Sequence, residues 1–265
     1  LMEGISHEAC SLAGTLGLGN LIAVYDDNDI SIDGNVEGWF TEDIPRRFEA
    51  YGWEVIPNID GHNPDEIDSA IQKAKSNKDK PTLICCKTII GKGSPNMAGT
   101  ASAHGAIVNP EEIALTRNEL NWENDPFDIP KEVYDDWDSR ESGKLQEEAW
   151  EKIFHDYSEE NPELSSELKR IIAGKLPDGI EESIYSYVET VQKDLPKMAT
   201  RVSSQKVLNV LGPLIPELLG GSADLTGSNN TNWEGTKAIR ADDFLGNYIN
   251  FGVREFGMTG IMNGM

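Results

Sequence analysis

The sequence predicts an α/β protein built on a parallel, doubly wound sheet, followed by a linker and the start of a second α/β domain. Residues 1–89 alternate continuous apolar segments with amphipathic helical ones, which is typical of parallel strands buried on both faces. Residues 111–196 are acidic and interrupted by prolines, and a new α/β pattern begins near residue 203. A chain of 265 residues is long enough for one large domain or two small ones.

The first helix is expected within residues 1–20, where Ile5, Ala9 and Leu12 recur at helical spacing. Ser6 is the expected N-cap of this helix. The apolar run 21–25 predicts a buried strand that ends in a polar loop.

Helices are predicted at about 42–51 and 65–76, the second one capped by Asn63 or Asp65, and strands at 53–56 and 82–89. Because neighbouring residues of a strand point to opposite faces, Cys85 and Cys86 should face opposite sides of the sheet. The Gly-rich segment 91–105 is too long for an ordinary connector and should cover a ligand.

Further along the chain, the pattern predicts helices at about 142–157 and 162–173 within a connecting arm. A helix beginning at Ser203, a strand at Leu218–Leu219 and a helix-like segment at 256–262 make up the start of the second unit. The six tryptophans are scattered, and we expect them to pack in cores or under the arm.

Composition excludes several classes of protein. The chain has 46 acidic and 23 basic residues and a net charge of −23, a field that repels nucleic acids and anionic membranes. It has no apolar run of about 18 residues and no signal-peptide pattern, which favours a soluble, cytoplasmic protein. Three cysteines cannot form a disulfide framework, which favours a reducing compartment.

An acidic cluster at residues 26–33 follows the first predicted strand, at the sheet edge where α/β proteins bind ligands. Its oxygen ligands suit Mg²⁺ or Ca²⁺. An EF-hand loop starting at Asp29 fails, because position 12 is Phe40 where a bidentate Glu is needed. A solvated acidic turn is the remaining alternative.

Six collinear segments together resemble the transketolase family, in order and at its spacing. They are MEGISHEA (2–9), YDDNDISID (25–33), FEAYGW (48–53), CKTIIGKGSP (86–95), GSADL (221–225) and VREFGM (253–258). The resemblance covers essentially the whole chain. It also implies that this is an internal piece of a longer protein, with little or no turnover alone.

The resemblance implies a thiamine diphosphate enzyme that transfers a two-carbon ketol group between sugar phosphates, in the pentose phosphate pathway or the Calvin cycle. Xylulose 5-phosphate and ribose 5-phosphate are the implied substrate class, and a homodimer is the implied assembly. Residues 1–165 would be the C-terminal part of the diphosphate-binding domain plus the arm, and 166–265 the linker and the N-terminal part of the pyrimidine-binding domain.

The family pattern also implies a role for particular residues. Asn28 and the carbonyl of Ile30 match metal ligands, whereas the opening Asp of the family's metal motif would lie upstream of Leu1. Glu255 matches the acid that hydrogen-bonds the aminopyrimidine of the cofactor, and Glu3 the acid that links the two active sites of a dimer. Two further positions match contacts of the cofactor: Ile32 (apolar) and Asp224 (near the thiazolium at the subunit interface).

His104 matches the histidine that reaches the diphosphate and the donor sugar. The family usually has a second histidine at the position of Ala101 and a proline at that of Ile107, so we expect altered handling of the donor. Arg201 and Ser228 match the residues that hold the acceptor phosphate, a task for which a guanidinium fork is suited. His7 is expected to be structural.

For each of these residues a plainer role stays open: a surface charge, a loop histidine, or a packing or turn residue. Alternatives for the whole protein also remain. A dihydroxyacetone synthase-like enzyme is a near relative, and deoxyxylulose phosphate synthase fits the strings poorly. A catalytically dead, dimerising transketolase-like subunit is the alternative from a different functional class.

Overall fold

The computed structural model describes residues 2–265, so Leu1, where the predicted first helix starts, lies outside the described residues. The chain forms two compact units. The first comprises the chain up to Glu123 together with Arg240–Phe244 and Val253–Met265, and the second comprises Asn124–Ile239 and Leu245–Gly252.

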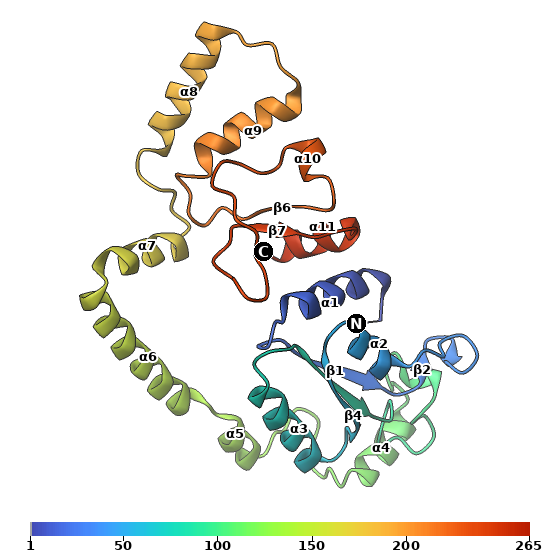
Figure 1. The fold of residues 1–265 in the computed structure, drawn as a ribbon. Coiled ribbons are helices and arrows are strands. Elements are labelled where there is room, and N and C mark those ends of the chain that lie inside the picture. Colours follow the sequence, from blue (N-terminus) through green and yellow to red (C-terminus); the bar gives the residue numbers. More distant parts are fainter. Residues whose placement is uncertain (1) are drawn as a thin grey trace. The chain divides into compact units, whose positions relative to one another are not determined.

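The first unit holds a parallel sheet and the helices that cover it (Figure 1). Its elements are α1 (Gly4–Leu16), β1 (Ile22–Asp27), β2 (Ile30–Ser31), β3 (Gly34–Asn35), α2 (Ile44–Ala50), β4 (Glu54–Asp60), α3 (Pro64–Ser76), β5 (Thr82–Lys87), the 3₁₀ turn η1 (Ala101–Ala103), α4 (Pro110–Glu119) and α11 (Glu255–Gly264).

The sheet has the strand order β1-β5-β4, and both pairings are parallel. Along β1 and β5, Ile22 pairs with Thr82 and Asp27 pairs with Lys87, so both strands end at the same edge. The register between β4 and β5 shifts between Ile56 and Ile59. The predicted parallel sheet is therefore confirmed. The expectation that the first strand is buried is wrong, because no residue of β1 is buried and Val24 is 57% exposed.

Helices cover both faces of this sheet, as a doubly wound fold requires. One core packs residues of α1 and α2 against Trp53, Leu83 and Cys85, and it includes the fully buried Phe48. The other core packs Ala70 and Ala74 of α3 with residues of β4 and β5, including Cys86. Cys85 and Cys86 thus face opposite sides, as predicted from the strand alternation.

The start of α1 differs from the sequence prediction. The N-cap is Glu3, not Ser6, which lies inside the helix and donates its amide to the Glu3 carbonyl at 3.0 Å. Further along, α1 passes very close to the turn that follows α2. A Cβ on Gly14 would lie 1.7 Å from the carbonyl oxygen of Tyr51 in that turn. Only glycine fits at this position.

The caps of α2 and α3 follow ordinary sequence signals. The Asp43 side chain accepts the Arg46 amide at 3.1 Å at the start of α2. For α3, the Asn63 side chain accepts the Asp65 amide at 3.1 Å, which settles the choice between the two predicted caps in favour of Asn63.

The second unit is mostly helical. Its elements are α5 (Lys131–Trp137), α6 (Arg140–Glu160), α7 (Pro162–Ile172), α8 (Ile180–Asp194), α9 (Thr200–Leu211), β6 (Gly220–Ser222), α10 (Thr226–Asn229) and β7 (Tyr248–Asn250). Strands β6 and β7 pair in parallel. The strand predicted at Leu218–Leu219 begins two residues later in the structure, where Gly220–Ser222 forms β6.

The expectation that the tryptophans pack inside is correct for two of the six. Trp53 and Trp233 are buried, and the indole of Trp53 donates to the Cys10 carbonyl at 2.8 Å. The other four have large exposed surfaces in this chain: Trp39, Trp122, Trp137 and Trp150. Within residues 2–265, no helix combines the length and apolarity that crossing a bilayer requires.

Candidate functional site

A cavity of about 630 Å³ opens in the first unit where β1 and β5 end. Ligands of open α/β sheets bind at this edge, beyond the carboxyl ends of the strands. Five of the predicted site residues line it: Glu3, Asn28, Ile30, Ile32 and His104. The rest of its wall comes from Met2, Tyr25, Asp26, Asp27, Asp29, Ser31, Val36, Phe40, Glu42, Asp43, Ile44, Pro45 and Lys87.

Lys87 neutralises part of the acidic loop at the end of β1. Its Nζ lies 2.6 Å from the Asp27 Oδ2 and 3.6 Å from the Asp29 Oδ2. The hydrogen bond with Asp27 raises the pKa of Lys87. Burial, together with the charges of Asp27 and Asp29, raises the pKa of Tyr25 to about 12. The edge of the cavity therefore combines a paired ammonium with a protonated phenol.

The loop itself is shaped by Asn28. The Asn28 Oδ1 accepts the Ile30 amide at 3.0 Å, and Asp29 takes up a left-handed φ of 59°. Strands β2 and β3 then close an antiparallel hairpin, in which Ser31 pairs with Gly34. A two-stranded hairpin replaces the twelve-residue calcium loop of an EF-hand, in agreement with the sequence argument.

This loop offers some, but not all, of the oxygen ligands that a hard cation needs. The Asn28 side-chain oxygen keeps a second lone pair, and the Ile30 carbonyl is a further hard oxygen ligand. Asp27 is paired with Lys87, and Asp26 accepts the hydroxyl of Thr88. Across residues 2–265, no three His, Cys, Asp or Glu side chains are grouped as metal ligands. The residues present fit a cation that takes its other ligands from outside this loop.

His104 and Ile32 are exposed on segments beside the cavity. His104 follows the 3₁₀ turn η1, and its amide donates to the Ala101 carbonyl at 3.0 Å. Ile32 is 72% exposed at the tip of the β2–β3 hairpin, an unusual position for an apolar side chain unless something covers it. His7 contacts Tyr51 Oη at 3.3 Å and Arg47 Nη1 at 3.4 Å, in line with a structural role.

Glu255 lies apart from this group, on another element of the same unit. It is the first residue of α11, where its side chain is exposed. Helix α11 packs against α1, the helix that Glu3 caps (Figure 1). The Gly257 amide of α11 donates to the Glu8 Oε2 at 2.6 Å.

Arg201, Asp224 and Ser228 belong to the second unit. Arg201 is exposed in the first turn of α9, and Ser228 is exposed on α10. Asp224 takes up a left-handed φ of 58° just before α10. Gln205 of α9 donates to the carbonyl of Asn232 at 3.1 Å, which ties α9 to the segment after α10.

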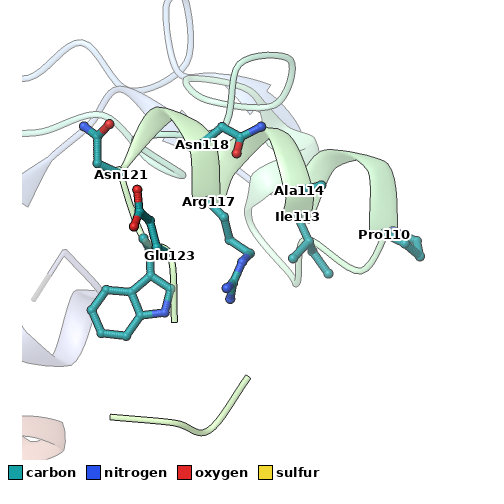
Figure 2. Close-up of a pocket in the computed structure, with 8 residues that line it drawn as sticks. Pro110, Ile113, Ala114, Arg117, Asn118, Asn121 and Glu123 are labelled. Carbon is teal, nitrogen blue, oxygen red and sulfur yellow. The ribbon is translucent and has the colours of Figure 1, made fainter. Parts of the chain in front are cut away.

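A second cavity, of about 540 Å³, follows one side of α4 and contains none of the predicted site residues. Figure 2 shows the side chains of Ile113 and Arg117 extending from the same side of this helix, one turn apart. The remaining lining residues are Pro110, Ala114, Asn118, Asn121, Trp122 and Glu123.

Two residues that shape the site were not predicted from the sequence: Lys87, which pairs with the acidic segment, and Glu112, which holds the loop of His104. Lys87 follows from strand pairing, because its partner in the register is Asp27. Glu112 is buried against the loop that carries His104, where it accepts hydrogen bonds from Ser94 and Asn96. No sequence pattern distinguishes Glu112 from its exposed neighbour Glu111.

Comparison with known proteins finds similarity to transketolases along the entire chain. The family model "Transketolase, thiamine diphosphate binding domain" matches residues 1–177, and "Transketolase, pyrimidine binding domain" matches residues 196–265. Transketolase 2 of Vibrio parahaemolyticus is 57% identical over 265 residues, and Transketolase 2 of Escherichia coli is 54% identical. Both alignments cover 100% of this chain and 40% of the relative.

Solved structures agree. A transketolase from Pichia stipitis, in complex with sedoheptulose 7-phosphate, matches with a TM-score of 0.90 and 40% identity, over 99% of this chain and 39% of its own. A transketolase from Leishmania mexicana matches with a TM-score of 0.89 and 35% identity over the same shares. The chain thus spans about 40% of the length of the curated relatives it matches, and both of its matched segments carry transketolase domains. The chain belongs to the transketolase family.

Proposed function

We propose that the protein containing this chain is a transketolase, which transfers a two-carbon ketol group reversibly from a ketose phosphate to an aldose phosphate. The identity of 57% over all 265 residues to a curated transketolase carries the proposal. Sugar phosphates of the xylulose 5-phosphate and ribose 5-phosphate class are the proposed substrates. Related transketolases from Pichia stipitis have been solved with sedoheptulose 7-phosphate, fructose 6-phosphate and xylulose 5-phosphate.

Thiamine diphosphate is the proposed cofactor, since the family model that matches residues 1–177 is named for binding it. When bound, it supplies a nucleophilic carbon and an electron sink for breaking the bond beside a carbonyl. Asn28 and the Ile30 carbonyl would hold Mg²⁺, or Ca²⁺, against the diphosphate. The exposed Ile32 at the cavity would give an apolar contact to the cofactor.

Four polar residues have proposed roles toward the cofactor and substrates. Glu255 would hold a proton at the pyrimidine ring, and its exposure in this chain leaves the carboxylate accessible to a cofactor. His104 would contact the diphosphate and the donor sugar from the cavity wall. Arg201 and Ser228 would bind the acceptor phosphate, the first by a charged fork and the second by one hydroxyl.

The proposed assembly is a cytoplasmic homodimer in which each site combines a diphosphate-binding domain and a pyrimidine-binding domain from different subunits. Residues 1–165 would contribute to the first domain and the arm, and residues 166–265 to the linker and the second domain. Glu3 would link the two sites, and Asp224 would lie near the thiazolium at the interface. Three cysteines without disulfide bonds support a reducing compartment.

The test is ketol transfer by the full-length protein, measured with xylulose 5-phosphate and ribose 5-phosphate in a coupled assay. We expect Glu255→Gln to lower kcat by about 10²- to 10⁴-fold, because an amide cannot exchange the ring proton. Glu147→Gln removes an exposed carboxylate from α6 and should leave the rate unchanged.

The competing interpretations give different results. Preference for formaldehyde over an aldose phosphate would indicate a dihydroxyacetone synthase-like enzyme. No turnover together with no heat of thiamine diphosphate binding would indicate a catalytically dead, dimerising subunit. The 265-residue chain spans about 40% of the length of its relatives and should show little or no turnover by itself. Robust activity of that piece would contradict this expectation.

A further inference from the structure

The segment that carries His104 is held by a buried carboxylate, that of Glu112, which has no part in the proposed chemistry. Glu112 lies in the first turn of α4 and is 5% exposed. The side chain it meets, Ser94, is 2% exposed. A buried carboxylate persists only when its oxygens are hydrogen-bonded.

Three donors from the loop converge on Glu112. The Oε1 accepts the Ser94 hydroxyl and, at 2.9 Å, the Asn96 amide. The Oε2 accepts the Asn96 side-chain nitrogen at 2.8 Å. The hydrogen bond from Ser94, followed by those from Asn96, lowers the pKa of Glu112. All three bonds join α4 to one turn of the loop, across 16 or 18 residues of sequence.

From this turn, hydrogen bonds continue without a break to His104. Ser94 Oγ accepts the Met97 amide at 3.3 Å, while the Met97 carbonyl accepts the Thr100 amide at 3.2 Å. The Thr100 hydroxyl donates to the same carbonyl at 2.7 Å. Thr100 is the N-cap of η1, whose Ala101 carbonyl accepts the His104 amide.

The base of the loop is fixed separately. The Ile89 amide donates to the Nε2 of His62 at 2.8 Å, and the Gly99 amide donates to the Ile90 carbonyl at 2.8 Å. Gly91 has a φ of +66°, and a Cβ there would lie 2.8 Å from the Cβ of Ala103. The loop thus closes on itself at its base. Glu112 holds the turn at Ser94 by hydrogen bonds from outside the loop, and the Leu120 side chain lies against Gly93 beside it.

We propose that Glu112 is a positioning residue, which sets the place of His104 at the cavity through the Ser94–Thr100 turn. This inference rests on the proposed role of His104 toward the donor. Glu112 lies outside the cavity wall and acts through the shape of the loop. Its loss should therefore affect handling of the donor ketose phosphate and leave the acceptor site, at Arg201 and Ser228, unaffected.

The test compares variants of the full-length protein. Glu112→Ala removes all three acceptor contacts, and we expect a rise in KM for the donor with a fall of about 10- to 100-fold in kcat/KM, the range for a displaced catalytic group. The KM of the acceptor should not change. Glu111→Ala removes an exposed carboxylate from the same turn of α4 and is the matched control.

The conservative variant Glu112→Gln should restore most of the activity. Its amide oxygen can accept from Ser94 and the Asn96 amide, and the Asn96 side chain can turn to accept from the new NH₂ group. A readout that does not depend on activity is amide hydrogen exchange. In Glu112→Ala, exchange should accelerate over residues 94–104 and stay slow in β5, which would show that the domain remains folded.

A double-mutant cycle with His104→Ala decides between the outcomes. If Glu112 acts through His104, Glu112→Ala has no further effect on kcat/KM when His104 is already alanine. Additive effects, or a Glu112→Ala protein that behaves like Glu111→Ala, would overturn the proposal alone. If His104→Ala itself does not change donor kinetics, the proposed role of His104 fails, and the positioning role fails with it.

Discussion

The amide of Gly257 donates a 2.6 Å hydrogen bond to the carboxylate of Glu8, joining two helices that are 249 residues apart in sequence. Gly257 is the third residue of α11, so its amide is one of those that the helix cannot satisfy internally. Glu8, inside α1, thereby acts as a side-chain cap for another helix and places a negative charge at the positive end of its dipole. Arg254, the N-cap of α11, donates to Ser11 of α1 at 3.0 Å.

Glu8→Ala should weaken the docking of α11 on α1 by about 1 kcal/mol, the usual contribution of an N-terminal cap. Glu8→Gln keeps an acceptor oxygen and should lose less. Urea unfolding followed by circular dichroism measures the change, and exchange of the Gly257 amide reports the contact directly. An Ala variant with unchanged exchange at Gly257 would contradict the capping role.

Two glycines of α11 should respond differently to alanine. A Cβ on Gly257 would lie 2.7 Å from the Glu8 Cβ, whereas one on Gly260 would meet the Ile5 Cδ1, at 2.9 Å, which can move aside. Alanine favours a helix over glycine by about 1 kcal/mol. Gly257→Ala should therefore destabilise by about 1–3 kcal/mol through overpacking, while Gly260→Ala is neutral or stabilising. Equal urea midpoints for the two variants would contradict this.

The three cysteines should be inert to thiol reagents while the protein is folded. Cys10, Cys85 and Cys86 are free and buried. Burial raises the pKa of Cys85 to about 11 and also raises those of Cys10 and Cys86, so little of the reactive thiolate exists near pH 8. An aromatic disulfide reagent should label all three in denaturant and almost none in the native protein. Fast labelling of native protein would be the opposite result.

Lys87 should support binding of the cofactor's diphosphate. It is the one lysine or arginine among the described residues that line the 630 Å³ cavity, in a chain of net charge −23. Lys87→Met would remove the ammonium that pairs with Asp27 and Asp29 and would make the site more negative. We expect affinity for thiamine diphosphate, measured by calorimetry with Mg²⁺ on the full-length protein, to fall about three- to tenfold.

Lys92→Met is the control for that experiment. Lys92 is exposed on the neighbouring loop and does not line the cavity, so its substitution removes the same charge from the chain without changing the cavity wall. If both variants bind the cofactor equally weakly, net charge and not the local ammonium is responsible.

Strands and helix caps were predicted correctly from the sequence where the pattern that specifies them lies within the segment itself. Strand β5 contains the continuous apolar run Leu83–Cys86, and Asn63 stands directly before a helix that begins with proline. The prediction failed for β6, because Gly220 and Gly221 have no side chains to signal a strand. The reason for these glycines lies elsewhere in the chain: a Cβ on Gly220 would lie 2.7 Å from Trp233, and one on Gly221 would lie 2.5 Å from Phe251.

The same distinction holds at the cavity. The acidic segment 26–33 was predictable as a group, since residues at the end of a strand and just beyond it share one sheet edge. The contacts of Glu8 and Glu112 were not, because each depends on segments brought together by the fold. Glu111 and Glu112 are adjacent and chemically identical, and only the packing of α4 against the loop buries one and exposes the other.

The order of the turn at Ser94 should depend on pH through Glu112. Hydrogen bonds from Ser94 and Asn96 lower the pKa of this carboxyl from its ordinary value of 4.5. The carboxylate's contribution is therefore fully present above pH 4.5 and is lost as the pH falls through the lower, folded-state pKa. The Asn96 amide, which donates to Glu112, should show a chemical-shift titration with a midpoint below 4.5. Glu112→Gln should abolish that titration, whereas Glu111→Gln should leave it intact. A midpoint above 4.5 would mean that burial outweighs the hydrogen bonds and that the turn is held by a neutral acid.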